Sequence, residues 1–253
     1  LARAHHLYML LFLGSASLSF LPSVRLPSLP AAACVEHIAS SPRLAATDPC
    51  KSASWPVVQG VLDEVPVFTV ANGEGQPLQY KTTGEGEDLA IFYADVAVAT
   101  KEYIAARDKF PDLGCDIISV GLGSAYKLSR EGKGMVVPGI ADLRGAGAPE
   151  GAQPMGQELP LFACMELRGE GDNSTKIPLY MSHADCAAAV AQAQGVTLEI
   201  NAILSLQDIV EELAGLDDPS SGEFLFMPPS LAMQHVASYV GQGVYMRKVE
   251  EEE

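Results

Sequence analysis

The sequence predicts an α/β protein built from two pseudo-symmetric, repeated strand–helix units, and three observations lead to this fold class. The order strand, strand, helix, strand, helix, strand, helix occurs in residues 57–145 and again in residues 157–253. Both units open with an apolar residue, Pro, a second apolar residue and Phe, at residues 65–68 and 159–162. Residues 146–156 join the units and are rich in Gly, Ala and Pro, a composition typical of a flexible linker. We therefore interpret the chain as an internal duplication.

Strands are predicted by short runs of apolar, β-branched and aromatic residues that end in turn-forming residues. The predicted strands are residues 65–68, 89–93, 115–120 and 135–138 in the first unit, and residues 159–162, 176–181, 198–203 and 224–228 in the second. Because Pro lacks an N–H donor, we expect the two opening strands to lie at a sheet edge or to begin just after their Pro. Several runs are apolar on both faces. They predict either strands covered by helices on both sides or one sheet shared between the units.

Helices are predicted to begin after residues that can cap a helix. Asp95 and Ser182 precede the first helix of each unit, and Asp185, three residues after Ser182, suggests a capping box. Ser205 caps a later helix that stops at Gly215. The predicted helices pass through residues 98–104, 124–128 and 140–144, and through residues 187–190, 205–213 and 231–240.

Residues 1–56 differ from the rest of the chain and are predicted to be a targeting leader. A short basic stretch precedes an apolar run at residues 7–13, which is the layout of a secretory signal peptide and is too short to span a bilayer. Residues 22–54 are rich in Ser, Ala and Pro and have few acids, as in an organelle transit peptide. In series, the two segments resemble the bipartite leader of algae with a secondary plastid, and Phe20 fits the junction. The alternative is a secretory signal followed by a flexible linker.

Charge restricts the classes of partner. The chain has a formal net charge of −16, and because residues 1–56 are net basic, the negative charge belongs to the body. Such a body repels phosphate backbones and anionic lipid headgroups, so we expect no nucleic-acid partner and no polybasic membrane contact. The same charge can attract basic partners or simply keep the surface solvated. No run after the leader is long enough for a transmembrane helix, although peripheral association stays possible.

The sequence has no recognisable catalytic, metal or cofactor motif, so it predicts a protein that is not an enzyme and that has no cofactor. The Gly-x-Gly at residues 121–123 lacks the third Gly of a dinucleotide fingerprint and is expected to be a turn. The Cys residues form no Cys-x-x-Cys pair, and those of the body lie in apolar stretches that predict burial. The His residues of the body, His183 and His235, have no metal-ligand spacing with them.

One apolar patch is a candidate protein-binding surface. It consists of Phe226, Met227, Pro228, Pro229 and Met233, near the end of the second unit. Met side chains adapt to varied partners, which favours a binding role. The alternative is an ordinary core at the end of a strand.

Three segments resemble one known family. They are residues 65–70 (Val-Pro-Val-Phe-Thr-Val), residues 72–78, where an Asn-Gly-Glu-Gly turn precedes Pro-Leu, and residues 120–126 (Val-Gly-Leu-Gly-Ser-Ala-Tyr). Together with looser matches in the second unit, they make about residues 60–240 similar to the Tic 22 kDa-like family, a component of the translocon at the inner envelope of chloroplasts that also occurs in cyanobacteria. The resemblance implies a two-lobed α/β fold and a soluble protein that chaperones preproteins between the envelope translocons.

Two functions are therefore expected for a plastid protein with this sequence. The first is a protein-import component that acts as a preprotein-binding chaperone in the envelope intermembrane space, with preproteins and translocon components as partners. The alternative is a soluble, peripheral structural subunit of a plastid membrane complex at the thylakoid, such as a photosystem with its antenna. A hydrolase or redox enzyme is a third class, and it would need a catalytic constellation that the sequence does not supply.

Overall fold

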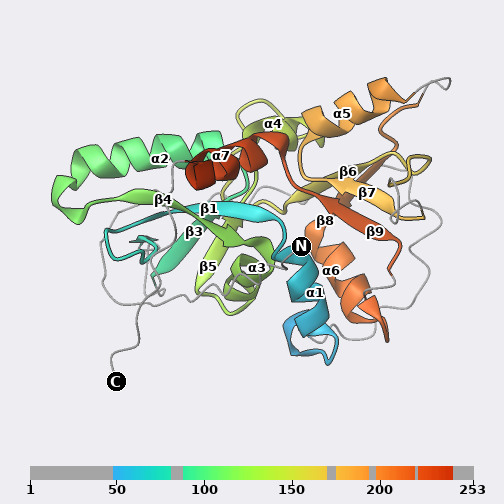
Figure 1. The fold of residues 1–253 in the computed structure, drawn as a ribbon, viewed down its shortest axis with the longest axis horizontal. Helices are drawn as coiled ribbons and strands as arrows, with labels where there is room; N and C mark the ends of the chain where they lie inside the picture. Colours follow the sequence, from blue (N-terminus) through green and yellow to red (C-terminus); the bar gives the residue numbers. More distant parts are fainter. Residues whose placement is uncertain (1–47, 81–87, 170–174, 194–197, 220–221, 242–253) are drawn as a thin grey trace.

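The computed structural model describes residues 48–80, 88–169, 175–193, 198–219 and 222–241. Most of the predicted leader lies outside these residues. The described chain forms two separate β-sheets, with helices between them and helices on both outer faces (Figure 1). The α/β fold class predicted from the sequence is confirmed. Of the two sheet arrangements considered, the one with separate, helix-covered sheets is correct.

The first sheet has the strand order β4-β1-β3-β5, with the short β2 also pairing with β3. Its strands are β1 (Pro66–Ala71), β2 (Gln79–Tyr80), β3 (Leu89–Tyr93), β4 (Asp116–Gly121) and β5 (Gly134–Val137). β1 is antiparallel to both of its neighbours, whereas β3 and β5 are parallel. A parallel pair needs a crossover connection, and the chain between β3 and β5 supplies it with two helices and β4.

The second sheet repeats this arrangement as β8-β6-β7-β9. Its strands are β6 (Pro160–Ala163), β7 (Ile177–Tyr180), β8 (Ala202–Ser205) and β9 (Phe224–Met227). The register also agrees, because Phe68 lies opposite Tyr93 in the first sheet and Phe162 lies opposite Tyr180 in the second. The two sheets therefore share strand order, direction and register. A duplication as the origin of this agreement stays a prediction.

Two details of the predicted strands were wrong. β1 and β6 are central strands, and each has its Pro as the first residue, where the missing N–H interrupts little of the ladder. The strand predicted at residues 198–203 begins later, at Ala202, because its partner β6 offers only four residues for pairing. Just before it, the Asn201 side chain accepts a hydrogen bond from the Met165 N–H, 2.9 Å away, in the turn after β6.

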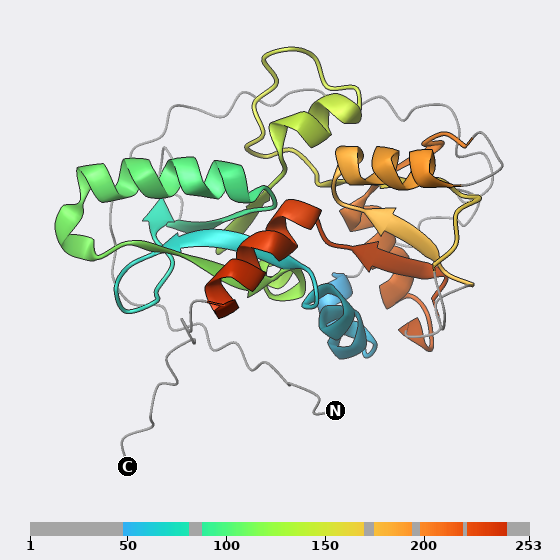
Figure 2. The ribbon, with the colours of Figure 1, turned by 45° about the horizontal axis from the view of Figure 1, so that its top comes forward.

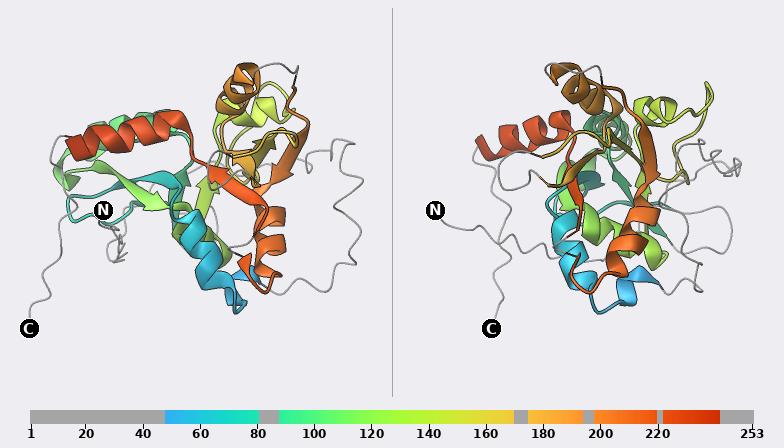
Figure 3. Two further views of the ribbon diagram at one scale, coloured as in Figure 1. Left: turned by 45° about the vertical axis from the view of Figure 1, so that its right-hand side comes forward. Right: turned by 90° about the vertical axis from the view of Figure 1, so that its right-hand side faces the viewer.

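Three helices fill the space between the sheets: α1 (Trp55–Leu62), α3 (Leu122–Arg130) and α6 (Leu206–Ala214). Helix α1 contacts both α3 and α6, and α1 and α6 lie side by side in Figure 3. Trp55, Val58 and Leu62 are buried in a core that also receives one face of each sheet. Burial of each large apolar side chain contributes roughly 1.5–3 kcal/mol, so this shared core holds the two lobes together.

Residues just before position 57 already take part in the fold. A 3-10 turn at Pro49–Lys51 precedes α1, and Trp55 is only 4% exposed. The Ser54 hydroxyl donates a hydrogen bond of 2.6 Å to the Ala214 carbonyl at the end of α6. Trp55 therefore belongs to the core, while the leader and its boundary stay predictions.

Four helices cover the outer faces of the sheets. They are α2 (Val96–Lys109), α4 (Ile140–Gly145), α5 (His183–Gln192) and α7 (Ser230–Gly241), and a second 3-10 turn spans Pro111–Leu113. In Figure 2, α7 crosses the first sheet beside α2, and α4 lies next to α5 on the second sheet. The last helix of each unit thus packs against the other unit. Among the described residues, no helix combines the length and apolarity needed to cross a membrane.

Candidate functional site

The structure divides the predicted binding patch between the core and the surface. Side chains of β9 alternate between the two faces of the sheet, so Phe226 points into the shared core and is 7% exposed. Met227, Pro228 and Pro229 are half-buried where the chain crosses from β9 to α7. Met233 is 45% exposed on α7. The five residues therefore do not form one surface, and Phe226 is a core residue.

Helix α7 carries the exposed part of this region. Ala232 is 1% exposed and packs with Val236 on the outer face of the first sheet. Leu231 and Met233 flank Ala232 in the sequence and therefore leave the helix on either side of this buried stripe. Leu231 is 60% exposed, more than any other large apolar side chain of the described residues. Two apolar side chains thus border the contact between α7 and the first lobe.

An aromatic contact and a capping carboxylate hold α7 in position. The His235 ring meets the Phe68 ring edge-on, with centroids 5.2 Å apart, and burial lowers the pKa of His235. At the start of α7, the Asp185 carboxylate accepts hydrogen bonds from the Ser230 N–H at 2.8 Å and from the Ser230 hydroxyl at 2.7 Å. Only half of the predicted capping box forms: the Ser182 hydroxyl accepts a hydrogen bond from the Asp185 N–H at 3.2 Å, but the Asp185 carboxylate caps α7, 45 residues along the chain.

The contact between α4 and α5 is built in a similar way. The Asp142 carboxylate accepts a hydrogen bond of 2.9 Å from the His183 N–H at the start of α5. Burial is the main cause that raises the pKa of Asp142, and Asp95 and Asp185 raise it further. A Cβ on Gly145 would lie 2.6 Å from the His183 ring, so the close approach of α4 to α5 requires glycine there. Helices α4 and α7, the two helices that each pack against the other unit, are therefore both held in place by a carboxylate that caps a helix amino terminus.

The Gly-x-Gly segment, predicted to be a turn, is a strand-to-helix junction where α1 contacts α3. Gly121 ends β4, and α3 begins at the next residue. A Cβ on Gly123 would lie 2.6 Å from the backbone oxygen of Gln59. The Asp63 carboxylate accepts a 2.8 Å hydrogen bond from the Ser124 N–H and so caps α3. The glycines therefore allow the close packing of α1 against α3.

The predicted burial of the body cysteines is confirmed for two of them and is wrong for the third. Cys164 and Cys186 are fully buried, as expected, and the Cys164 thiol donates to the Glu166 carboxylate at 3.2 Å. Cys115 is only half-buried, because it lies in the loop before β4. Burial raises the pKa of Cys186 to about 11, which keeps this thiol protonated and unreactive at neutral pH. Among the described residues, no group of three His, Cys, Asp or Glu side chains is placed to hold a metal ion.

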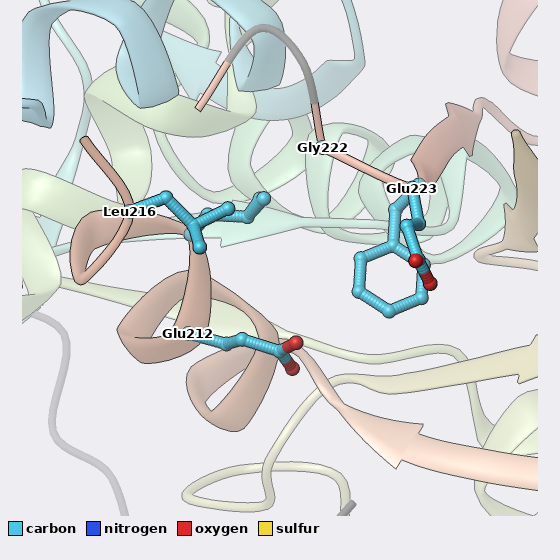
Figure 4. Close-up of a pocket in the computed structure, with 6 residues that line it drawn as sticks. Glu212, Leu216, Gly222 and Glu223 are labelled. Carbon is cyan, nitrogen blue, oxygen red and sulfur yellow. The ribbon is translucent and has the colours of Figure 1, made fainter. Parts of the chain in front are cut away.

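A pocket of about 330 Å³ lies between the end of α6 and the start of β9 (Figure 4). It is lined by Glu212, Leu213, Leu216, Gly222, Glu223 and Phe224. Burial, followed by the charge of Glu223, raises the pKa of Glu212. Sequence reasoning missed this site because Glu212 reads as part of the solvated face of a helix, and nothing local places Glu223 beside it.

These features define a class of fold. It has two α/β lobes of the same topology, a shared helical core, and a last helix in each unit that packs against the other unit. Two solved structures are similar over nearly their whole length. Tic22 from Plasmodium falciparum has a TM-score of 0.59 and 17% identity, over 74% of this chain and 98% of that chain. Tic22 from Anabaena, described as a protein of protein transport, has a TM-score of 0.57 and 17% identity, over 73% and 97%. The chain therefore has a Tic22-like fold. No protein-family model and no curated protein matches it.

Proposed function

We propose that this chain is a plastid protein-import component that acts as a preprotein-binding chaperone of the envelope intermembrane space. The observation that carries the proposal is the Tic22-like fold, which extends over 98% and 97% of the two similar chains. The Anabaena structure is described as a protein of protein transport. The plastid-type leader expected from residues 1–56 supports the same organelle independently of the fold.

The surface of the described chain suits an unfolded client. Leu231 and Met233 on α7, Ile203 on β8 and Ile140 on α4 are each at least 39% exposed, and all lie outside the shared core. Dispersed apolar side chains of this kind can contact many sequences weakly, and Met adapts its shape to each of them. The net charge of −16 attracts basic segments over a longer range. Together these properties favour reversible binding of varied polypeptides.

An aggregation assay tests the proposal. A chemically unfolded client protein is diluted into buffer with the full chain, and light scattering is followed over time. We expect the chain to slow aggregation in proportion to its concentration. The double variant Leu231→Ser/Met233→Ser should protect less, whereas Val57→Ser, which removes an apolar side chain of similar exposure (43%) from α1, should protect as well as the original protein. An equal rate of aggregation with and without the chain would contradict the proposal.

The proposed location has a separate test. Protease protection of intact plastids, before and after rupture of the outer envelope membrane, should show the chain becoming accessible at the second step. Recovery with thylakoid complexes would instead support the alternative of a peripheral structural subunit, which the comparisons do not favour.

A further inference from the structure

The pocket between α6 and β9 combines acidic and apolar walls in a way that the surface of α7 does not. Glu212 comes from the last turn of α6, and Glu223 immediately precedes β9, so the two side chains enter from opposite sides (Figure 4). Leu213 and Phe224 form its buried floor, at 5% and 9% exposure, and Leu216 forms a rim that is 40% exposed. The volume of about 330 Å³ is at the small end of the range of about 300–1,000 Å³ typical of ligand sites.

The charge of this pocket is unbalanced. Both glutamates are exposed, and within the described residues no ion pair joins Glu212 or Glu223 to a Lys or Arg side chain. The two carboxylates act on each other, and Glu223 makes ionisation of Glu212 less favourable. A positive charge placed between them would stabilise both carboxylates.

The residues that line the pocket restrict which kind of cation it can bind. A metal ion such as Ca²⁺ takes six to eight oxygen ligands, and this pocket offers two carboxylates among Leu and Phe side chains. A long cationic side chain fits the lining better, because its apolar stem can pack on Leu213 and Leu216 while its charged head lies between the carboxylates. A guanidinium group is favoured over an ammonium group, since it is more weakly hydrated and can stack on the Phe224 ring.

We propose that the pocket lined by Glu212, Glu223 and Phe224 binds an arginine side chain of a basic, acid-poor leader segment in a client polypeptide. The identity of the client rests on the proposed function, whereas capture of the guanidinium does not. The amino-terminal part of this same chain illustrates the expected ligand, since Arg25 and Arg43 lie there among Ser, Ala and Pro with few acids. The exposed apolar residues of α7 would then hold apolar stretches, and the pocket would select the basic ones.

A pair of peptides and two double variants test this inference. The probe is a fluorescein-labelled peptide of Ser, Ala and Pro with two Arg, and its control carries citrulline, a neutral analogue of the same shape, at both Arg positions. Binding to the full chain is measured by fluorescence anisotropy. We expect the Arg peptide to bind about tenfold more tightly, because only the charged guanidinium is attracted by both carboxylates.

The variants separate the pocket from the general charge of the protein. Glu212→Gln/Glu223→Gln should abolish the preference for Arg over citrulline. Glu150→Gln/Glu199→Gln removes the same charge from exposed sites elsewhere and should keep the preference. Equal loss in both double variants, or an undiminished preference in the pocket variant, would overturn the inference. Thermal unfolding checks the fold of the pocket variant, which should melt no lower than the original protein because a repulsion is removed.

The outcome also distinguishes this inference from the proposed function. Arg-selective binding at the pocket without any protection of an unfolded client would keep the pocket and refute the chaperone. Protection of the client by a protein that binds the Arg and citrulline peptides equally would support the chaperone and refute the arginine pocket.

Discussion

The two lobes have the same strand order and register, yet their outer faces are covered very differently. On the first lobe, α2 and α7, with 14 and 12 residues, bury Tyr93 and Val137 to 2% exposure. On the second lobe, α5 and α4 have only 10 and 6 residues, and the corresponding Tyr180 and Met227 are half-buried. The apolar cluster under α2 and α7 has no counterpart among the described residues of the second outer face. One strand pattern thus supports a closed lobe and a more open one, and helix length makes the difference.

Truncation of the equivalent Phe in each lobe should have the largest effect and tests whether the sheets are equally packed. Phe68 and Phe162 are both 0% exposed and lie at matching positions of β1 and β6. Phe68→Ala and Phe162→Ala should each lower the free energy of unfolding by about 3–5 kcal/mol, because each leaves a cavity. Urea unfolding measures both. If Phe162→Ala cost less than half as much as Phe68→Ala, the second lobe would be loosely packed even at its centre.

A smaller loss of stability is expected when the contact between α4 and α5, the short helices on the outer face of the second lobe, is disturbed. Gly145→Ala places a Cβ against the His183 ring and should destabilise the protein by about 1–3 kcal/mol. Gly60→Ala is the matched control in α1, since its added Cβ has no atom within 4 Å, and it should stabilise by about 0.5–1 kcal/mol. Thermal unfolding of the two variants gives the comparison. Equal stability for both would mean that α4 is not pressed against α5.

The pH dependence of the α4–α5 contact is the third test. Burial raises the pKa of Asp142 above its ordinary value of 3.8, so the folded state holds the proton more tightly than the unfolded state. The contribution of Asp142 to stability is therefore complete below the ordinary value and is lost as pH rises through the raised one. Asp142→Asn removes this titration, so the original protein should lose stability relative to the variant over that window. Urea unfolding between about pH 3 and 7 measures the difference, and a constant difference would contradict the assignment.

The smallest effect on stability is expected at a position where the lobes differ on the surface. Ile203 lies opposite Phe162 in the second sheet and is 39% exposed, whereas Ser119 lies opposite Phe68 in the first. Ile203→Ser makes the lobes alike and should change the free energy of unfolding by less than about 0.5 kcal/mol. It should still reduce the protection of an unfolded client in the scattering assay. Full protection would remove this part of the second lobe from the proposed binding surface.

Sequence patterns predicted the local elements well where local chemistry decides them. Asp95, Ser182 and Ser205 each accept a backbone hydrogen bond at the start of the predicted helix, as their side chains allow. Helix α1 was missed because it lies next to a leader-like composition and contains Gly60, a poor helix former in its interior, whereas Pro56 lies in the first turn, where Pro is tolerated. It forms because tertiary contacts of Trp55, Val58 and Leu62 outweigh that propensity.

The candidate sites could be predicted only in part, because they depend on contacts between distant residues. Met233 was found as an apolar residue of a helix, but its exposure follows from the way Ala232 docks on the first sheet. For Phe226, a core role and a binding role both stayed open, because every residue of β9 is apolar and the sequence gives no sign of which face is core. Glu212 and Glu223 lie on different elements, and their pairing in one pocket follows from the position of α6 against β9. The role of Asp185 at α7 likewise required the fold.

The exchange of outer helices has a consequence for the order in which the chain completes its structure. Because α7 is the last described helix and packs with α2 on the first sheet, the contact of His235 with Phe68 forms only after α7 has emerged from a ribosome or a translocation pore. The outer face of the first lobe is therefore completed only after the second unit has emerged. For the import route proposed above, this order would delay completion of the fold until the crossing has ended.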